Sequence, residues 1–203
     1  IIKSYSKRNF TLISESDHGI YDAMNKGLDL SKGDIIGFLN SDDSYYSNEI
    51  LGEIVRVLRD KSVDIVHGDI KFVDNNGKLV RYWKAEPFSK GQFGRSMSPA
   101  HPSFYCHRSV YERVGVFSLN YKIVGDLEFM FRALELHNLS SSILDKCIVE
   151  MRLGGASTRS FFTTWYIFKE VKEFHAYHNV RFNSLLYWIW KFRKLINQKV
   201  FKE

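Results

Sequence analysis

Two adjacent aspartates, Asp42 and Asp43, follow closely on a short apolar run at residues 35–39. Neighbouring carboxylates repel each other unless a positive charge lies beside them. A divalent cation is a common solution, because Mg²⁺ or Mn²⁺ is held by one or two carboxylates together with the phosphate oxygens of a substrate. The pair therefore indicates a metal site for a phosphate-bearing ligand, although an aspartate that only caps the next turn is the simpler alternative.

The position of this pair along the chain favours a ligand site. An uninterrupted apolar run such as residues 35–39 is typical of a strand that is buried on both faces. In open α/β sheets, ligands bind outside the carboxyl ends of the strands. We therefore expect Asp42 and Asp43 at an edge of the sheet where chemistry takes place.

Apolar periodicity along the rest of the chain alternates between strands and helices. We expect strands at residues 10–14, 35–39, 63–66, 103–107 and 143–151. Helices are expected at residues 20–30, at residues 48–60 with Ser47 as the N-cap, and at residues 127–137. A hairpin of residues 71–73 and 79–83 should turn at Asn76-Gly77, because this pair tolerates positive φ angles. The order of elements predicts an α/β sandwich with a mixed central sheet.

The helix expected at residues 48–60 should pack on the sheet through one apolar face. The residues of that face are Ile50, Leu51, Ile54, Val57 and Leu58.

Composition is that of an ordinary globular protein. The chain has 203 residues, of which 44% are hydrophobic and 26% charged, enough for one domain with an appendage. The longest apolar run, residues 185–190, is far shorter than the ~20 residues that a membrane-spanning helix needs. Two cysteines, Cys106 and Cys147, argue against a disulfide scaffold and favour a cytoplasmic setting.

The net charge of +6 is concentrated near the C-terminus. Residues 1–158 hold 20 basic and 20 acidic side chains, whereas residues 159–203 hold 9 and 3. The same 159–203 stretch holds 13 of the 31 aromatic residues. Because the composition changes there, we expect a main domain at residues 1–158 and a basic, aromatic helical tail at residues 159–203.

Several short motifs occur in order along residues 10–158. They are Glu15-Ser16-Asp17-His18-Gly19-Ile20-Tyr21-Asp22-Ala23-Met24-Asn25-Lys26-Gly27, then Asn40-Ser41-Asp42-Asp43, His67-Gly68-Asp69, His101-Pro102-Ser103-Phe104-Tyr105, Gly125-Asp126-Leu127-Glu128 and Gly154-Gly155-Ala156-Ser157. Together they closely resemble the family 2 glycosyltransferases of bacterial polysaccharide and lipopolysaccharide assembly. The resemblance implies the nucleotide-sugar-binding fold called type A, and an enzyme that uses a UDP- or GDP-sugar as its donor.

The resemblance also implies roles on the donor side. Asp43 matches the direct ligand of the Mg²⁺ or Mn²⁺ ion that bridges the diphosphate, and Asp42 matches the residue that contacts the ribose and the ion. Further donor contacts are implied for Asn25, Lys26, Gly155 and Ser157. The simpler alternative for the glycine pair is a turn without a ligand.

On the acceptor side, Asp126 resembles the family's general base. It would take the proton of an acceptor hydroxyl as that oxygen attacks the anomeric carbon, a single displacement that inverts the configuration. His101 and Glu128 are implied on the same side. The alternatives are that Asp126 is only an N-cap and that His101 is a buried structural histidine.

The sequence departs from the family pattern in two respects. The strand-helix-strand segment that reads the nucleotide base in the family has no counterpart before residue 10, which predicts an open apolar edge on the strand at residues 35–39. We therefore expect either a fragment of a longer enzyme or a partner that completes the sheet. The Gln-x-x-Arg-Trp motif of processive members is absent, which implies transfer of one sugar per encounter.

The tail should form two helices, at residues 160–178 and 183–198. In the second helix an apolar stripe opposes basic residues, as in a helix that lies in a membrane interface. The stripe consists of Leu185, Trp188, Ile189, Phe192 and Ile196, and the opposite side of Lys191, Lys194 and Gln198. Packing of the stripe on the core or on a partner subunit is an equal alternative.

The main prediction is an inverting, metal-dependent glycosyltransferase that adds a single sugar to a glycan or a lipid-linked saccharide. It would act in the cytoplasm, at the inner face of the cytoplasmic membrane, with peripheral contact through residues 160–200. The alternative is a catalytically inactive interaction module that keeps the fold. A nucleic-acid partner is not expected, because the main domain carries no excess of positive charge.

Overall fold

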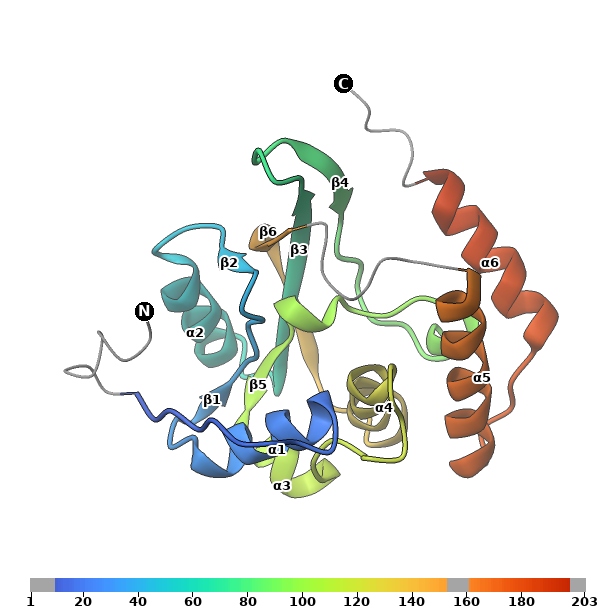
Figure 1. Cartoon of the computed structure of the whole chain (residues 1–203), viewed down its shortest axis with the longest axis horizontal. Helices are drawn as coiled ribbons and strands as arrows, with labels where there is room; N and C mark the ends of the chain where they lie inside the picture. The colour runs from blue at the N-terminus through green and yellow to red at the C-terminus, as the bar shows by residue number, and fades with distance from the viewer. Residues whose placement is uncertain (1–9, 153–160, 198–203) are drawn as a thin grey trace.

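The computed structural model describes residues 10–152 and 161–197, which form a mixed sheet with helices on both faces (Figure 1). The sheet has the strand order β1-β5-β3-β6-β2, and β4 also pairs with β3. Strands β3 and β6 are parallel, and the other pairs are antiparallel. The strands are β1 (Ile35–Ile36), β2 (Ser44–Tyr45), β3 (Ile65–Val73), β4 (Leu79–Trp83), β5 (Tyr105–His107) and β6 (Ser141–Arg152).

Six α-helices accompany this sheet within the described ranges. They are α1 (Ile20–Leu30), α2 (Ile50–Asp60), α3 (Arg108–Val114), α4 (Gly125–Phe131), α5 (Phe161–Tyr177) and α6 (Ser184–Asn197). Helix α4 continues into a π turn, η4 (Arg132–Leu136), and two 3₁₀ turns, η2 (Phe93–Arg95) and η3 (His101–Ser103), lie in the connection before β5.

Two hydrophobic clusters lie on opposite faces of the sheet. Helix α2 covers one face, where Ile50, Ile54 and Leu58 pack in a cluster that includes Val66 of β3. Helices α1, α3, α4 and α5 contribute to the cluster on the other face, which includes Ile65 of β3. Adjacent residues of β3 enter different clusters because successive side chains of a strand point to opposite sides.

The predicted hairpin and the first helix are confirmed. Helix α1 has the expected bounds, and β3 pairs with β4 around the predicted turn. Gly77 has φ of +78°, in the left-handed region that glycine tolerates. The Asp74 carboxylate fixes the turn by accepting hydrogen bonds from the backbone N–H groups of Asn76 and Lys78, both at 2.9 Å.

Of the two N-terminal strands that were predicted, the first is absent and the second is shorter than expected. Residues 10–14 form no strand, and Phe10 and Ile13 are exposed. The strand predicted at residues 35–39 is limited to Ile35–Ile36 and, among the described strands, pairs only with β5. The chain leaves the sheet at Gly37, whose backbone packs so tightly on Tyr105 that an added Cβ would lie 2.1 Å from the ring. The expected open edge at β1 is therefore present in the part of the sheet that the structure describes.

Other boundaries also differ from the predictions. Ser47 is not the N-cap of α2, because the helix begins at Ile50 and Glu49 takes the cap position without a side-chain cap bond. Leu51 is 43% exposed, so the buried face of α2 is narrower than expected. The strands predicted at residues 63–66 and 71–73 are parts of one strand, β3. The strand predicted at residues 103–107 begins at Tyr105, after η3.

Helix α4 begins two residues earlier than predicted, with Val124 at the N-cap. Asp126 therefore lies within the first turn of the helix. The alternative that Asp126 serves only as an N-cap is excluded by this register.

The two tail helices are confirmed, but they share the core of the main domain. One buried cluster contains Phe168, Val171 and Phe174 of α5 together with Phe129 and Phe131 of α4. The ring centroids of Phe131 and Phe174 are 4.9 Å apart. The change in composition after residue 158 therefore does not mark a boundary in the packing. No helix in the described ranges is long and apolar enough to cross a bilayer.

Candidate active site

Asp126 is a partly exposed carboxylate that two neighbouring side chains orient. Its side chain is 29% exposed. Oδ1 lies 2.9 Å from the hydroxyl of Tyr21, which donates a hydrogen bond, and Oδ2 lies 3.7 Å from Nδ1 of His101. The arrangement holds a proton acceptor in a fixed direction while leaving it accessible, as general base catalysis requires.

Tyr21 connects α1 to the start of α4. Its hydroxyl also lies 2.7 Å from the carbonyl oxygen of Ile123. Burial, together with the charge of Asp126, raises the pKa of Tyr21 far above its ordinary range, so the phenol stays a donor. The ring packs so closely on Gly125 that an added Cβ would meet it at 2.7 Å. Sequence reasoning gave Tyr21 no role, because its partner lies 105 residues away.

His101 lies beside Asp126 on the 3₁₀ turn η3, as the resemblance implied. Its ring is stacked on Phe38, with the centroids 6.0 Å apart, and meets Phe117 edge-on at 5.9 Å. Burial lowers the pKa of His101, and the nearby charge of Asp126 opposes this shift. A neutral imidazole between aromatic rings can stabilise the direction of the carboxylate without neutralising it.

Asp42 and Asp43 lie in the turn between β1 and β2. The Asn40 amide donates a hydrogen bond of 2.9 Å to Oδ2 of Asp43. Burial raises the pKa of Asp43, and the charge of Asp42 adds to this, whereas Asn40 and the backbone N–H of Arg152 oppose it. A bound cation would offset both effects, so the pair fits the predicted metal role. No group of three His, Cys, Asp or Glu side chains suited to a metal occurs within the described ranges. Substrate oxygens would therefore have to complete the coordination.

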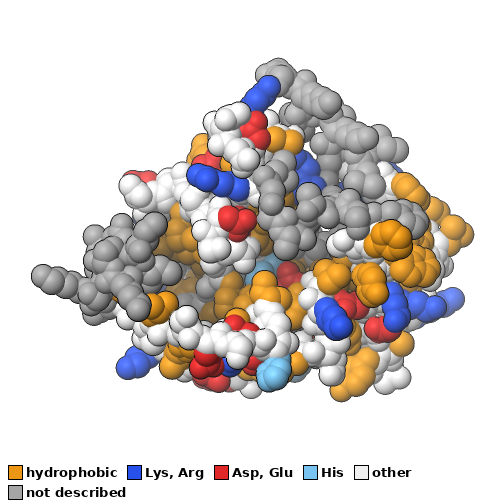
Figure 2. All heavy atoms as spheres, in the orientation of Figure 1, with side chains coloured by type: hydrophobic (Ala, Val, Ile, Leu, Met, Phe, Trp, Pro, Cys, Tyr) orange, Lys and Arg blue, Asp and Glu red, His pale blue; other side chains and the backbone are white. Residues whose placement is uncertain are grey.

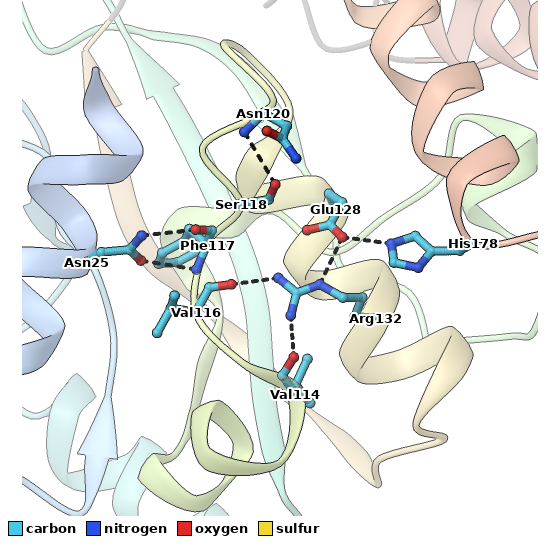
Figure 3. A network of polar contacts seen from close by, with 9 residues as sticks. All are labelled: Asn25, Val114, Val116, Phe117, Ser118, Asn120, Glu128, Arg132 and His178. Carbon is cyan, nitrogen blue, oxygen red and sulfur yellow. Dashed lines mark hydrogen bonds and ion pairs between the residues drawn. The ribbon is translucent and has the colours of Figure 1, made fainter. Parts of the chain in front are cut away.

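Asn25 was expected beside the nucleotide, and the structure shows it holding the backbone. Its amide nitrogen donates to the carbonyl oxygen of Phe117 at 2.9 Å, and its amide oxygen accepts from the N–H of Phe117 at 3.0 Å (Figure 3). This reciprocal pair ties α1 to the loop that packs against His101. A nucleotide contact would have to use the remaining hydrogen-bonding capacity of the amide.

Lys26 was also expected at the nucleotide, and the structure surrounds it with carboxylates. Its Nζ lies 2.8 Å from Glu15, 2.9 Å from Asp17 and 3.3 Å from Asp22. These carboxylates raise the pKa of Lys26 well above its ordinary range, and Glu15 makes the largest contribution. The ammonium contributes to the wall of a groove of about 880 Å³ between residues 10–17 and α1. A phosphate contact would require Lys26 to exchange at least one of these partners.

Glu128 was expected on the acceptor side, and the structure places it in a buried polar network. Its side chain is only 3% exposed, and Oε1 accepts a hydrogen bond from Nε of Arg132 at 2.8 Å. The ring nitrogen Nε2 of His178 lies 2.8 Å from the same oxygen (Figure 3). Arg132 also donates to the carbonyl oxygens of Val114 and Val116. Both partners contact Oε1, so an acceptor contact of Glu128 would have to use Oε2, which is buried without a hydrogen-bond partner among the described residues.

Two other expected donor contacts, Gly155 and Ser157, lie outside the described residues. A structural feature that sequence reasoning missed is Glu170 of α5, a buried carboxylate that accepts backbone hydrogen bonds just before α4. An isolated glutamate on an apolar helix gives no sequence signal of such a long-range contact.

Solved structures share this fold. The S. aureus protein TarS, residues 1–349 in complex with UDP-GlcNAc, matches with a TM-score of 0.58 and 16% identity over 91% of this chain and 55% of that chain. The mannosyltransferase PcManGT from Pyrobaculum calidifontis, in complex with GDP-Man and Mn²⁺, matches with a TM-score of 0.58 and 13% identity over 87% of this chain and 48% of that chain. These matches confirm the predicted type A glycosyltransferase fold.

Sequence relatives agree with this assignment. A PGL/p-HBAD biosynthesis glycosyltransferase of Mycobacterium tuberculosis is 29% identical over 119 residues, which cover 58% of this chain and 44% of the relative. An uncharacterized glycosyltransferase of the same species is 33% identical over 123 residues, covering 59% and 46%. The chain thus matches less than half the length of these relatives. The family model for glycosyl transferase family 2 matches residues 1–118, more than half of the sequence, so the chain belongs to glycosyl transferase family 2.

Proposed function

We propose that this chain takes part in inverting, metal-dependent transfer of a single sugar from a nucleotide sugar to a hydroxyl group of a glycan or lipid-linked saccharide. The observation that carries the proposal is the position of Asp126, which is accessible and oriented by Tyr21. Membership of a glycosyltransferase family supplies the reaction class.

In the proposed step, the Asp126 carboxylate accepts the proton of the acceptor hydroxyl. The acceptor oxygen forms a bond to the anomeric carbon while the bond from that carbon to the diphosphate oxygen breaks. Attack from the face opposite the leaving group inverts the configuration. The single hydroxyl proton of Tyr21 is shared between Oδ1 of Asp126 and the carbonyl oxygen of Ile123, which orients Asp126 so that Oδ2 accepts the proton of the acceptor hydroxyl.

Asp42 and Asp43 would hold the Mg²⁺ or Mn²⁺ ion. When bound, the ion supplies positive charge that stabilises the departing diphosphate. Asn40 fixes the direction of Asp43 through its hydrogen bond at 2.9 Å. The binding of UDP-GlcNAc and of GDP-Man with Mn²⁺ by proteins of the same fold supports a nucleotide-sugar donor here.

The test combines nucleotide binding with sugar transfer. Calorimetric titration with UDP and GDP should show binding that depends on Mn²⁺ and is lost in Asp43→Ala. The control is Asp145→Ala, because Asp145 is an exposed carboxylate on β6. With a working donor, Asp126→Asn should lower kcat by about 10²- to 10⁴-fold at unchanged nucleotide affinity. Equal kcat in Asp126→Asn and the unmutated protein would rule out the proposed base. Nucleotide binding that is unchanged in Asp43→Ala would rule out the metal site.

A second proposal concerns contact with an anionic membrane surface. Helices α5 and α6 expose a set of apolar side chains, seen as the orange area over these helices in Figure 2. The set consists of Phe162, Trp165, Tyr166, Leu185, Leu186, Ile189 and Phe192, each at least 40% exposed. The surplus of basic residues in the same helices is complementary to anionic lipid. A lipid-linked acceptor and a location at the inner face of the cytoplasmic membrane would follow from this contact.

Vesicle sedimentation tests the contact. The unmutated chain should sediment with vesicles that contain anionic phosphatidylserine and much less with neutral phosphatidylcholine vesicles. Replacement of Trp165, Ile189 and Phe192 by Ser should abolish sedimentation. Leu119→Ser, at a 58% exposed leucine outside the tail, is the matched control. Sedimentation that is unaffected by the triple replacement would exclude this surface as the membrane contact.

A further inference from the structure

Glu170 is a buried carboxylate on α5 that accepts hydrogen bonds from three consecutive backbone N–H groups. The residue is 8% exposed. Oε1 accepts from the N–H of Lys122 at 2.9 Å, and Oε2 accepts from Ile123 at 3.0 Å and Val124 at 3.1 Å. Hydrogen bonds to an ionised carboxylate are stronger than those between neutral groups. Three of them therefore fix the segment 122–124 to the tail helix.

The contact reaches the N-cap of α4. Val124 takes the N-cap position without a side-chain cap bond, and its own backbone N–H donates to Glu170. The other two donors, Lys122 and Ile123, lie just before the helix. The acceptor lies 46 residues further along the chain than Val124, so a tertiary contact holds the segment that leads into α4.

The fixed segment leads directly to Asp126. The peptide group of Ile123 is held from two sides, since its N–H donates to Glu170 and the carbonyl oxygen of Ile123 accepts from Tyr21 at 2.7 Å. The same tyrosine hydroxyl lies 2.9 Å from Oδ1 of Asp126. A shift of the segment would change both the start of α4 and the position of the Tyr21 hydroxyl. Glu170 thus acts on the carboxylate through one peptide group and one side chain.

We propose that Glu170 is a positioning residue for Asp126 and that α5 is part of the catalytic apparatus. This inference rests on the proposed role of Asp126 as the general base. Glu170 touches neither substrate nor metal in this account. It holds the segment 122–124 so that the Tyr21 hydroxyl meets the Asp126 carboxylate and leaves its second oxygen toward the acceptor.

The test compares Glu170→Gln with Glu173→Gln in the full chain. Glutamine keeps the size of the side chain but places an N–H₂ donor against the backbone donors. Glu173 lies one turn further along the same helix, and its side chain is 53% exposed, which makes it a matched control. Backbone hydrogen exchange should accelerate at least tenfold at Lys122, Ile123 and Val124 in Glu170→Gln and remain unchanged in Glu173→Gln.

Kinetics provide the second measurement, with UDP-GlcNAc and GDP-Man tested as donors. We expect Glu170→Gln to lower kcat by about 10- to 100-fold per folded molecule, with KM for the donor unchanged within twofold. The pH at which kcat reaches half its plateau should rise, because Asp126 loses a donor to its ionised form. In the Asp126→Asn background, Glu170→Gln should cause no further loss.

The outcomes separate this inference from the proposed function. Unchanged exchange at residues 122–124 in Glu170→Gln would overturn the positioning role, whatever base the enzyme uses. Faster exchange with unchanged kcat and pH profile would also overturn it, since Glu170 would then serve stability alone. If Asp126→Asn is fully active while Glu170→Gln is impaired, Asp126 is not the base. The proposed function and the catalytic meaning of the positioning role would then both be wrong, even if hydrogen exchange showed that Glu170 holds residues 122–124.

Discussion

The hydroxyl of Tyr21 lies 2.9 Å from Oδ1 of Asp126 and joins helix α1 to the first turn of α4. Because burial and the charge of Asp126 raise the pKa of Tyr21 far above its ordinary range, the phenol keeps its proton and remains a hydrogen-bond donor near neutral pH. Asp126 therefore keeps one oxygen engaged and one oxygen available.

Replacement of Tyr21 by Phe should impair transfer with little effect on donor binding. A hydrogen bond to a charged group contributes about 1.5–3 kcal/mol, which corresponds to a loss of roughly 10- to 100-fold in kcat. Steady-state kinetics over a range of pH should also show the half-plateau at higher pH. Tyr177→Phe, at a 74% exposed tyrosine, is the control and should leave both quantities unchanged. A Tyr21→Phe variant with unaltered kcat would show that the hydrogen bond does not orient Asp126.

Removal of the Arg132 side chain should strongly destabilise the fold. Glu128 is buried, so loss of its guanidinium partner leaves a carboxylate with His178 as its remaining partner. Breaking a buried ion pair in this way typically costs about 3–5 kcal/mol. Urea denaturation of Arg132→Ala should show this decrease in the free energy of unfolding.

A surface pair provides the control for that experiment. Arg113 lies 3.1 Å from Asp64, but its side chain is 53% exposed. Arg113→Ala should therefore lower the free energy of unfolding by less than about 1 kcal/mol. Equal losses in the two variants would contradict the structural role given to the Glu128 network.

His67 should make the protein less stable in mild acid. It is 1% exposed on β3, neither ring nitrogen has a hydrogen-bond partner among the described residues, and burial lowers its pKa from 6.5 to about 4. Between these values the unfolded chain binds a proton that the folded chain does not, so stability falls as the pH decreases from about 6.5 to 4. The full effect is about 3 kcal/mol.

The measurement is the free energy of unfolding of His67→Gln at pH values from 4 to 7. Its dependence on pH should be weaker than that of the unmutated chain by roughly this amount. His137→Gln, at an exposed histidine, should retain the original dependence. A His67→Gln curve parallel to the original would mean that His67 is accessible to protons in the folded state.

The Asn40 amide should tune metal binding through Asp43. It donates to Oδ2 of Asp43 and lowers its pKa, opposing burial and Asp42. Asn40→Ala should therefore raise the pKa of Asp43, and protons should compete more effectively with the metal as the pH falls. Titration of UDP with Mn²⁺ should show a larger loss of affinity on going from about pH 7 to pH 5 in the variant than in the unmutated protein. Asn75→Ala, in the β3–β4 turn, is the control and should match the unmutated protein.

The sequence predicts elements whose determinants are local. Helix α1 has its expected bounds because its apolar spacing and flanking glycine lie within one segment, and the turn at Gly77 depends on adjacent residues. The strand at β1 is shorter than predicted because the close contact between Gly37 and Tyr105 involves residues far apart in the chain. An apolar run of five residues cannot reveal where such a contact ends the pairing.

The same difference between local and long-range determinants applies to the residues of the site. Asp126 and His101 were recognisable from motifs, and the structure brings them together. Glu128, two residues after Asp126 in the same motif, instead contacts Arg132 and His178, because residues two positions apart on a helix point to opposite sides. The roles of Tyr21 and Glu170 depend on partners 105 and 46 residues away, which no spacing rule indicates. Among the carboxylates around Lys26, Asp22 is one that sequence spacing could have predicted, since it precedes Lys26 by four residues on one helix.

The hydrophobic cluster shared by α4 and α5 limits which segments of this chain can be exchanged with those of a relative. A chimera that exchanges only the C-terminal helices with those of a relative would separate Glu170 from the backbone of residues 122–124 and Phe174 from Phe131. The C-terminal helices and the loop before α4 should therefore be exchanged together. A change of specificity that is introduced through the tail would require matching changes in this loop. For the engineer, the practical unit of exchange runs from this loop through α5.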